Sequence, residues 1–172
     1  VKAGADYVND ISGLQFDPEM GRVVAESGAG LFLMHTRGRP ETMQSDTGYD
    51  DIMAEIITYL ETSLAMARDA GISDDKVAVD PGIGFGKSVA GNLEVMRRLN
   101  ELAVLGRPIL LGTSRKSFIG KILKLENPDD RLAGSLPTIA LGVAAGVKIF
   151  RVHDVRASRE VAEMAWAISN DA

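Results

Sequence analysis

The chain contains no cysteine. Disulfides, thiolate zinc sites, iron–sulfur clusters and cysteine nucleophiles are therefore excluded, which fits a reducing compartment. Long apolar runs are lacking as well, because the longest, residues 139–147, is less than half of the roughly 20 residues that a membrane-spanning helix needs. No positively charged segment with an apolar stretch opens the chain, so we expect no export signal, no membrane partner and a cytoplasmic location.

An excess of positive charge is also lacking. Nineteen Lys and Arg residues stand against 24 Asp and Glu residues, for a net charge of −5. This sign is wrong for non-specific binding to nucleic acid, so we expect no nucleic-acid partner, and any bound anion needs a local cluster of cations. The 172 residues, 45% of them hydrophobic, are enough for one well-filled core. No linker-like or low-complexity stretch divides residues 1–172.

Apolar, β-branched segments alternate with segments of helical spacing. The first kind, typical of strands buried on both faces, lies at residues 6–11, 30–35, 76–80, 108–112 and 147–152. The second kind lies at residues 17–27, 49–70, 92–105, 130–145 and 158–168, and Pro137 requires a helix start or a kink in the fourth. This alternation predicts an α/β fold with a parallel sheet. Five short units without a nucleotide fingerprint favour part of a (β/α)8 barrel over an open doubly wound sheet.

Each predicted strand ends in polar or glycine-rich residues. Parallel strands place their carboxyl ends on one face, where barrels and open sheets both carry their active sites. We therefore expect five groups to converge, namely residues 9–10, 35–38, 80–82, 112–116 and 151–154.

A glycine-rich loop follows the third predicted strand, at residues 80–88. A phosphate-binding loop of the Walker type needs glycine where Pro81 stands, and the glycine spacing does not fit the dinucleotide fingerprint either. What remains is the carboxylate of Asp80, followed by a loop flexible enough to bring its backbone and Phe85 against a flat ligand. The alternative is that Asp80 only caps a turn.

Cations gather after the last two predicted strands. Arg115 and Lys116 follow the fourth strand, and Arg151 and His153 alternate along the fifth so that both point the same way. Barrels commonly bind phosphate at these two positions, so we expect an anion site, although Arg115 and Lys116 could also lie in an ordinary solvated loop. His35, the other histidine, is either a hydrogen-bonded structural residue or a functional one, and the two histidines do not have zinc-site spacing.

Five blocks of the sequence resemble, in order and spacing, the dihydropteroate synthase family. They are Val-Asn-Asp-Ile-Ser-Gly at 8–13, Leu-Met-His at 33–35 with Arg-Gly-Arg-Pro-Glu-Thr-Met-Gln at 37–44, Asp-Pro-Gly-Ile-Gly-Phe-Gly-Lys at 80–87, Ser-Arg-Lys-Ser-Phe-Ile-Gly at 114–120 and Arg-Val-His-Asp-Val at 151–155. Members of this family are (β/α)8 barrel transferases of folate biosynthesis and targets of sulfonamides. They join para-aminobenzoate to 6-hydroxymethyl-7,8-dihydropterin diphosphate and release pyrophosphate.

The resemblance implies a role for individual residues. For the pterin it implies contacts from Asn9, Met34, Asp80, Gly84, Phe85, Gly112, Lys116 and Arg151. Catalysis would fall to Lys116, Arg151 and Asp80, the diphosphate would be held by Arg151, His153 and Ser114, and the aminobenzoate by Ser117 and Arg115.

The resemblance also implies what the chain lacks. The five predicted strands resemble the fourth to eighth of the family's barrel, so residues 1–172 are expected to form a single partial pterin-binding domain without the first three βα units. The family uses Mg²⁺, and its magnesium-binding Asn would lie in that absent part, so we expect no metal ligand here. A homodimer is expected for the full-length protein. The alternatives are the pterin-binding domain of a pterin-dependent methyltransferase and a non-catalytic pterin-binding fragment.

Overall fold

A computed structural model describes residues 1–170 of the chain and contains five short parallel strands. They are β1 (Tyr7–Asp10), β2 (Gly30–Met34), β3 (Val77–Asp80), β4 (Leu110–Leu111) and β5 (Ile149–Phe150). Strands β1, β2 and β3 pair in that order, β4 pairs with β5, and a parallel bridge between Val79 and Ile109 connects the two sets. The predicted α/β fold with parallel strands is confirmed.

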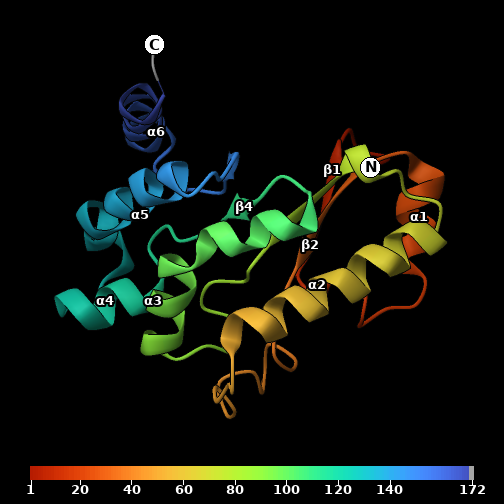
Figure 1. The fold of residues 1–172 in the computed structure, drawn as a ribbon, viewed down its shortest axis with the longest axis horizontal. Helices are drawn as coiled ribbons and strands as arrows, with labels where there is room; N and C mark the ends of the chain where they lie inside the picture. The colour runs from red at the N-terminus through yellow and green to blue at the C-terminus, as the bar shows by residue number, and fades with distance from the viewer. Residues whose placement is uncertain (171–172) are drawn as a thin grey trace.

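Helices follow every strand and pack around the sheet (Figure 1). The α-helices are α1 (Met20–Ser27), α2 (Ile52–Asp69), α3 (Val89–Arg97), α4 (Ser117–Leu123), α5 (Leu132–Ala144) and α6 (Val155–Ser169). Short 3-10 helices lie at Asp74–Lys76, Leu99–Leu105 and Pro128–Arg131. The fourth unit carries the additional helix α4, and the helix predicted at residues 92–105 is divided into α3 and the 3-10 helix Leu99–Leu105. Of the two positions allowed for Pro137, the helix start is wrong, because Pro137 lies inside α5.

Helix α2 illustrates how local sequence determines an element. Its N-cap is Asp51, whose side chain accepts hydrogen bonds from the backbone N–H groups of Met53 (3.0 Å) and Ala54 (3.2 Å), which would otherwise lack partners. Its buried apolar side chains recur at three- and four-residue intervals and form one stripe, which is Ile52, Met53, Ile56, Leu60, Leu64 and Ala67. This stripe packs into the main core.

The main core lies on the helix-facing side of the sheet. Alternate residues of the central strands belong to it, namely Leu31, Leu33, Val77, Val79, Ile109 and Leu111. The prediction that all strands are buried on both faces is wrong for β1 and β5, each of which has one paired neighbour among the described residues. Tyr7 of β1 is 57% exposed, and its ring stacks on Phe32 of β2 with 5.0 Å between ring centroids.

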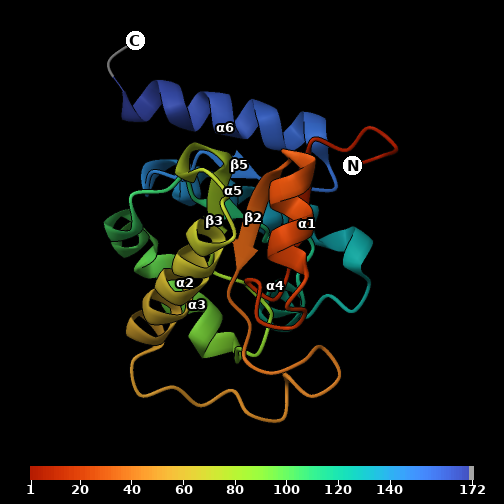
Figure 2. The same cartoon turned by 90° about the vertical axis from the view of Figure 1, so that its right-hand side faces the viewer.

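Two further segments matter for the site. Figure 2 shows the long connection between β2 and α2 as a wide arc beyond the end to which the β2 arrow points. Helix α6 lies on the outside and packs along α5 (Figures 1 and 2). The polar strand ends therefore meet on the side where this connection lies, and α6 lies away from it.

Candidate functional site

The register of the sheet brings side chains from β1, β2 and β3 to one face. Residues paired between parallel neighbours point to the same side of a sheet, and side chains alternate along each strand. Met34 pairs with Asp80, and Asn9 pairs with Phe32, which lies two residues before Met34. Asn9, Met34 and Asp80 therefore share the face opposite the main core.

The same argument extends across β4 and β5. The Val79–Ile109 bridge places Leu110 on the face of Asp80, and Leu110 pairs with Ile149. Two residues further along each strand lie Gly112 and Arg151, which occupy the same face at the carboxyl end. An added Cβ on Gly112 would lie 2.5 Å from Nη2 of Arg151, so the glycine leaves room for the guanidinium.

A buried carboxylate is the centre of this face. Asp80 is 1% exposed, and its Oδ1 accepts a hydrogen bond from the N–H of Gly82 at 2.7 Å. Its Oδ2 accepts one from Nη2 of Arg151 at 3.0 Å, and Nη1 of Arg151 donates to Oδ1 of Asn9 at 2.7 Å. Burial raises the pKa of Asp80, and the charge of Arg151 opposes that rise. Asp80 thus caps its own turn with one oxygen and holds a cation with the other.

Lys116 approaches from the loop after β4. Its Nζ lies 4.3 Å from the centroid of the Phe85 ring, a cation–π contact. An added Cβ on Gly84 would lie 3.3 Å from Cδ of Lys116, so this glycine lets the lysine stem pass close to the loop. Burial lowers the pKa of Lys116, and the charge of Asp80 opposes the effect.

His153 and Ser114 form a second polar pair. Nδ1 of His153 lies 3.0 Å from Oγ of Ser114, and the backbone N–H of His153 donates to the same oxygen at 3.2 Å. The hydroxyl therefore fixes the position of the imidazole at the end of β5.

Arg115 does not join these cations, so the expectation that it belongs to the anion cluster is corrected. Its Nη2 makes an ion pair with Asp154 at 2.8 Å, and its Nη1 pairs with Asp129. The backbone of Arg115 has a φ of 58°, in the left-handed region. Ser117 is exposed at the start of α4 and lines a separate surface groove with Lys121 and Arg131.

Most of the remaining predicted site residues line one cavity of about 260 Å³. It is lined by Asn9, Ile11, Phe85, Gly112, Ser114, Lys116, Arg151, Val152 and His153. Asp80 and Gly84 adjoin this lining without being part of it, through the Asp80–Arg151 pair and the close approach of Gly84 to Lys116. Met34 lies beside Asp80 in the sheet register, outside the lining. The motif reasoning did not select Ile11 and Val152, although their positions beside polar strand ends could have indicated them.

The structure adds a buried pair that the sequence did not assign. Lys87 is 3% exposed, and its Nζ lies 2.8 Å from Nδ1 of His35, 3.0 Å from the carbonyl oxygen of Gly82 and 3.1 Å from that of Phe85. Burial lowers the pKa of Lys87 to about 7. Burial, with the nearby charge of Lys87, lowers the pKa of His35 to about 2, so its imidazole is neutral at ordinary pH.

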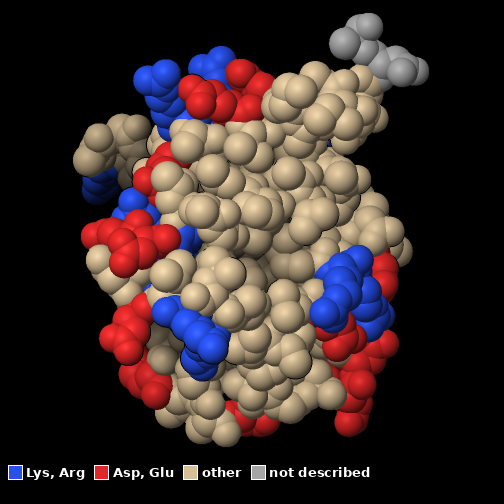
Figure 3. Space-filling model, turned by 90° about the vertical axis from the view of Figure 1, so that its left-hand side faces the viewer, with Lys and Arg blue, Asp and Glu red and all other residues tan. Residues whose placement is uncertain are grey.

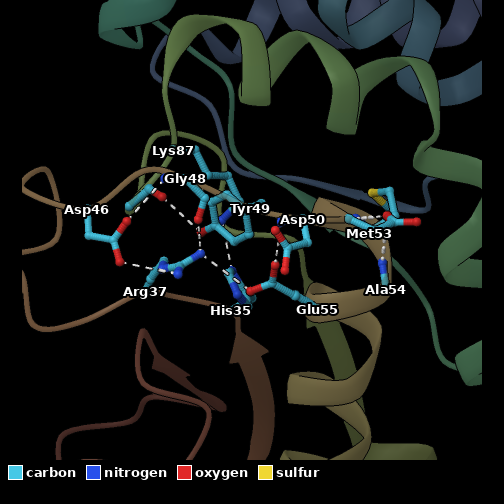
Figure 4. Close-up of polar contacts among 12 residues, drawn as sticks. His35, Arg37, Asp46, Gly48, Tyr49, Asp50, Met53, Ala54, Glu55 and Lys87 are labelled. Carbon is cyan, nitrogen blue, oxygen red and sulfur yellow. Dashed lines mark hydrogen bonds and ion pairs between the residues drawn. The ribbon is translucent and has the colours of Figure 1, made fainter.

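Contacts from the connection after β2 reach the loop after β3. Figure 4 shows Arg37 directed at Asp46, Gly48 and Glu55 of this connection and of α2, with ion-pair distances of 3.2 Å to Asp46 and 3.4 Å to Glu55. Two hydrogen bonds bridge the loops directly: the hydroxyl of Tyr49 donates to the carbonyl of Gly86 at 2.8 Å, and Nε2 of Gln44 to that of Gly84 at 2.9 Å. The glycine-rich loop is therefore held from several sides.

Residues 1–170 do not provide a metal centre of their own. Within this range no group of three or more His, Cys, Asp or Glu side chains is placed to hold a metal ion. The charge at the cavity is mainly cationic, from Lys116 and Arg151. These residues do not fit a bound cation. Separately, none of the helices in this range is long and apolar enough to cross a membrane.

Comparison with known proteins places the chain among pterin-binding enzymes. The profile of the family described as "Pterin binding enzyme" matches residues 1–153. The dihydropteroate synthase of Synechocystis sp. is 44% identical over 168 residues, which are 98% of this chain and 58% of that protein.

Solved structures give the same result. The dihydropteroate synthase of Clostridium difficile, solved in the presence of pteroic acid, superposes with a TM-score of 0.90 at 46% identity and covers 97% of this chain and 61% of that one. The Thermus thermophilus enzyme in complex with 6HMPPP has a TM-score of 0.92 at 39% identity, over 98% of this chain and 66% of that one. A further structure of the Thermus enzyme contains 4-aminobenzoate. The chain spans about three fifths of the length of these relatives.

Proposed function

The chain belongs to the pterin-binding enzyme family, and from that membership we propose that it is the part of a dihydropteroate synthase that holds the pterin and its diphosphate. The reaction joins para-aminobenzoate to 6-hydroxymethyl-7,8-dihydropterin diphosphate. We propose further that residues 1–172 form one partial domain, equivalent to the fourth to eighth βα units of a (β/α)8 barrel. The observation that carries the proposal is the contact of Asn9, Arg151 and Asp80 at the wall of a cationic cavity.

The pyrimidine edge of a pterin contains a guanidine unit, which matches what Asp80 already binds. The guanidinium of Arg151 donates to the carboxylate of Asp80 and to the amide oxygen of Asn9. A pterin presenting its own N–H groups to the same two oxygens displaces Arg151. The Arg151 side chain is 41% exposed, so it is free to swing and lie over the ring or beside the diphosphate. Lys116, Phe85, Gly84, Gly112 and Met34 complete the slot.

The chemistry needs stabilisation of a leaving group more than a nucleophile from the protein. The bond between the pterin methylene carbon and the diphosphate oxygen breaks, and the amine nitrogen of aminobenzoate forms the new C–N bond and loses a proton. Negative charge develops on the departing pyrophosphate, where Lys116, Arg151, His153 and the hydroxyl of Ser114 are placed to receive it. Asp80 holds the heterocycle in place throughout.

For the aminobenzoate carboxylate we propose one contact, Ser117, of the two residues that the sequence suggested. Arg115 is already paired with two carboxylates, Asp154 and Asp129, so a third carboxylate would have to displace one of them. Ser117 is exposed and adjacent to Lys116, which supports Ser117 alone as the contact for the aminobenzoate carboxylate.

A homodimer of the full-length protein belongs to the same proposal. The face formed by α4, α5 and α6 has a broad area without charged side chains (Figure 3). Large exposed apolar residues of these helices include Leu141, Met164, Trp166 and Ile168. Such a surface supports pairing with another protein surface. The cytoplasmic location stays a prediction, as does the use of Mg²⁺ with a ligand outside this chain.

Substitution of the central carboxylate tests the proposal. Asp80→Asn should weaken binding of dihydropterin diphosphate, measured by calorimetry, by roughly 10- to 100-fold, because a charge-assisted hydrogen bond is worth about 1.5–3 kcal/mol. Asp10→Asn is the matched control, since Asp10 is also buried at a strand end but bonds only its own loop, through Ser12 and Leu14. Equal loss in both variants would contradict the role of Asp80.

Two ligands separate the alternatives. Binding of pyrophosphate that is lost in Arg151→Ala supports the synthase over a pterin-dependent methyltransferase, because methyl transfer needs no diphosphate site. Pterin binding without dihydropteroate formation by the chain identifies a binding fragment, and joining the chain to the residues that the relatives have in addition then tests for activity.

A further inference from the structure

Lys87 is a buried cation that has no role in the sequence motifs or in the proposed reaction. It ends the glycine-rich loop after β3 and is 3% exposed, yet it does not line the cavity. A lysine is almost never buried so completely unless its ammonium group is paired. Its partners therefore indicate what it does.

The ammonium group is fully satisfied by three acceptors. It has three N–H donors, and its Nζ lies within 3.1 Å of Nδ1 of His35 and the carbonyl oxygens of Gly82 and Phe85. Because the imidazole of His35 is neutral, its Nδ1 is free to accept a hydrogen bond. Lys87 thus ties the loop after β3 to the end of β2, as Figure 4 shows for Lys87 and His35.

The two carbonyls connect Lys87 to both functional ends of the loop. Gly82 donates its N–H to Asp80 and offers its carbonyl to Lys87, so a single residue links the carboxylate to the ammonium group. Phe85 offers its carbonyl to Lys87 while its ring faces Lys116 at 4.3 Å. Movement of Lys87 would therefore move both the turn after Asp80 and the ring that lines the slot.

We propose that Lys87 is a positioning residue of the pterin site: its buried ammonium group fixes the loop that carries Phe85 and, through Gly82, the turn that holds the carboxylate of Asp80. This inference rests on the proposed function for its connection to pterin, and on the link through Gly82 for its effect on Asp80.

The charges around the pair come from several elements. Arg151 at the end of β5 and Lys116 after β4 face Asp80 from the cavity side. Lys87 is close enough to Asp80 for the carboxylate to raise its pKa, while Lys116 lowers it. Arg37 and Lys87 both act on His35. Lys87 has its own three partners away from the cavity, so displacement of Arg151 from Asp80 by a ligand does not require it to move.

The test is a titration of the Asp80 carboxyl carbon by NMR, with no ligand added. Lys87→Met should raise the pKa of Asp80 by about one unit, as expected when an opposite charge nearby is removed. Lys76→Met is the matched control: Lys76 also donates to a glycine carbonyl, that of Gly28, but it lies at the other end of β3, and it should leave the pKa of Asp80 unchanged. An unchanged pKa of Asp80 in Lys87→Met overturns the proposal.

Lys87→Gln provides a second variant should Lys87→Met fail to fold, because its amide can still donate to a loop carbonyl but carries no charge. An unchanged pKa of Asp80 in Lys87→Gln likewise overturns the proposal. Binding of dihydropterin diphosphate is measured in parallel, with an upward shift of its acidic midpoint expected in Lys87→Met. If the unsubstituted chain does not bind this ligand, the proposed function fails, while the Asp80 titration still decides the role of Lys87.

Discussion

Mild acid should destabilise the protein through His35. The imidazole is 3% exposed, lies edge-on to the Tyr59 ring with 4.9 Å between centroids, and faces the ammonium group of Lys87 at 2.8 Å. Its pKa is lowered from 6.5 to about 2 in the folded chain. Between pH 6.5 and pH 2, His35 is protonated in the unfolded state but neutral in the folded state. The free energy of unfolding therefore falls as the pH falls.

The size of the effect follows from the width of this window. Each pH unit below 6.5 costs about 1.4 kcal/mol of the free energy of unfolding, so a change from pH 6.5 to pH 4 costs about 3 kcal/mol from His35 alone. The total free energy of unfolding of a typical domain is only about 5–15 kcal/mol. Asp80 acts in the opposite direction, because its raised pKa lets the folded state take up a proton first.

Urea denaturation of the chain and of His35→Gln at pH 7 and pH 4 isolates the contribution of His35 to the pH dependence of stability. The glutamine keeps an acceptor for Lys87 but does not titrate, while Asp80 titrates in both proteins and cancels in the difference. The substitution should lower stability at pH 7 and reduce the loss between pH 7 and pH 4 by about 3 kcal/mol. Equal losses in the two proteins would refute the assignment of a buried neutral imidazole.

The remaining predictions use pairs of matched substitutions and the same denaturation assay. Gly82→Ala should cost at least about 2 kcal/mol, because φ is 69° and the added Cβ would lie 1.9 Å from the carbonyl oxygen of His35, and it should also weaken pterin binding. Gly106→Ala, with a φ of 62° and no atom within 4 Å of the added Cβ, should cost about 1 kcal/mol. Leu60→Ala, at a fully buried position of α2, should cost about 2–5 kcal/mol, and Val104→Ala, at a position 70% exposed, less than about 0.5 kcal/mol. An equal loss of stability in the two variants of either pair would contradict the packing described for that pair.

The position of a strand end could be read from the sequence because it depends on short-range pattern. An apolar run followed by a polar residue marks where a parallel strand leaves the core, and this placed Asn9, Asp80 and Arg151 correctly at one edge of the sheet. Alternation relates residues within one strand only. Which residues of different strands share a face follows from the register, which the structure supplies.

The direction of a side chain in a loop could not be read in the same way. Arg115 and Lys116 are neighbours, yet Arg115 turns to Asp129 and Asp154, which belong to later segments of the chain, while Lys116 turns to Phe85. The burial of Lys87 likewise depends on His35, which comes from another βα unit. The direction of each of these side chains depends on partners from distant segments of the chain, which a local sequence pattern does not reveal.

The pairing of Asp80 with Arg151 has a consequence for selectivity. Asp80 is buried, so an uncompensated negative charge there would be costly, and the guanidinium of Arg151 neutralises it. A ligand that displaces the guanidinium must itself give N–H donors to the carboxylate and to Asn9, otherwise two acceptors lose their partners. A heterocycle with a guanidine-like edge meets this condition, whereas an isosteric ring without the exocyclic amine does not. Discrimination against such a ring should therefore come mainly from the cost of leaving Asp80 unpaired.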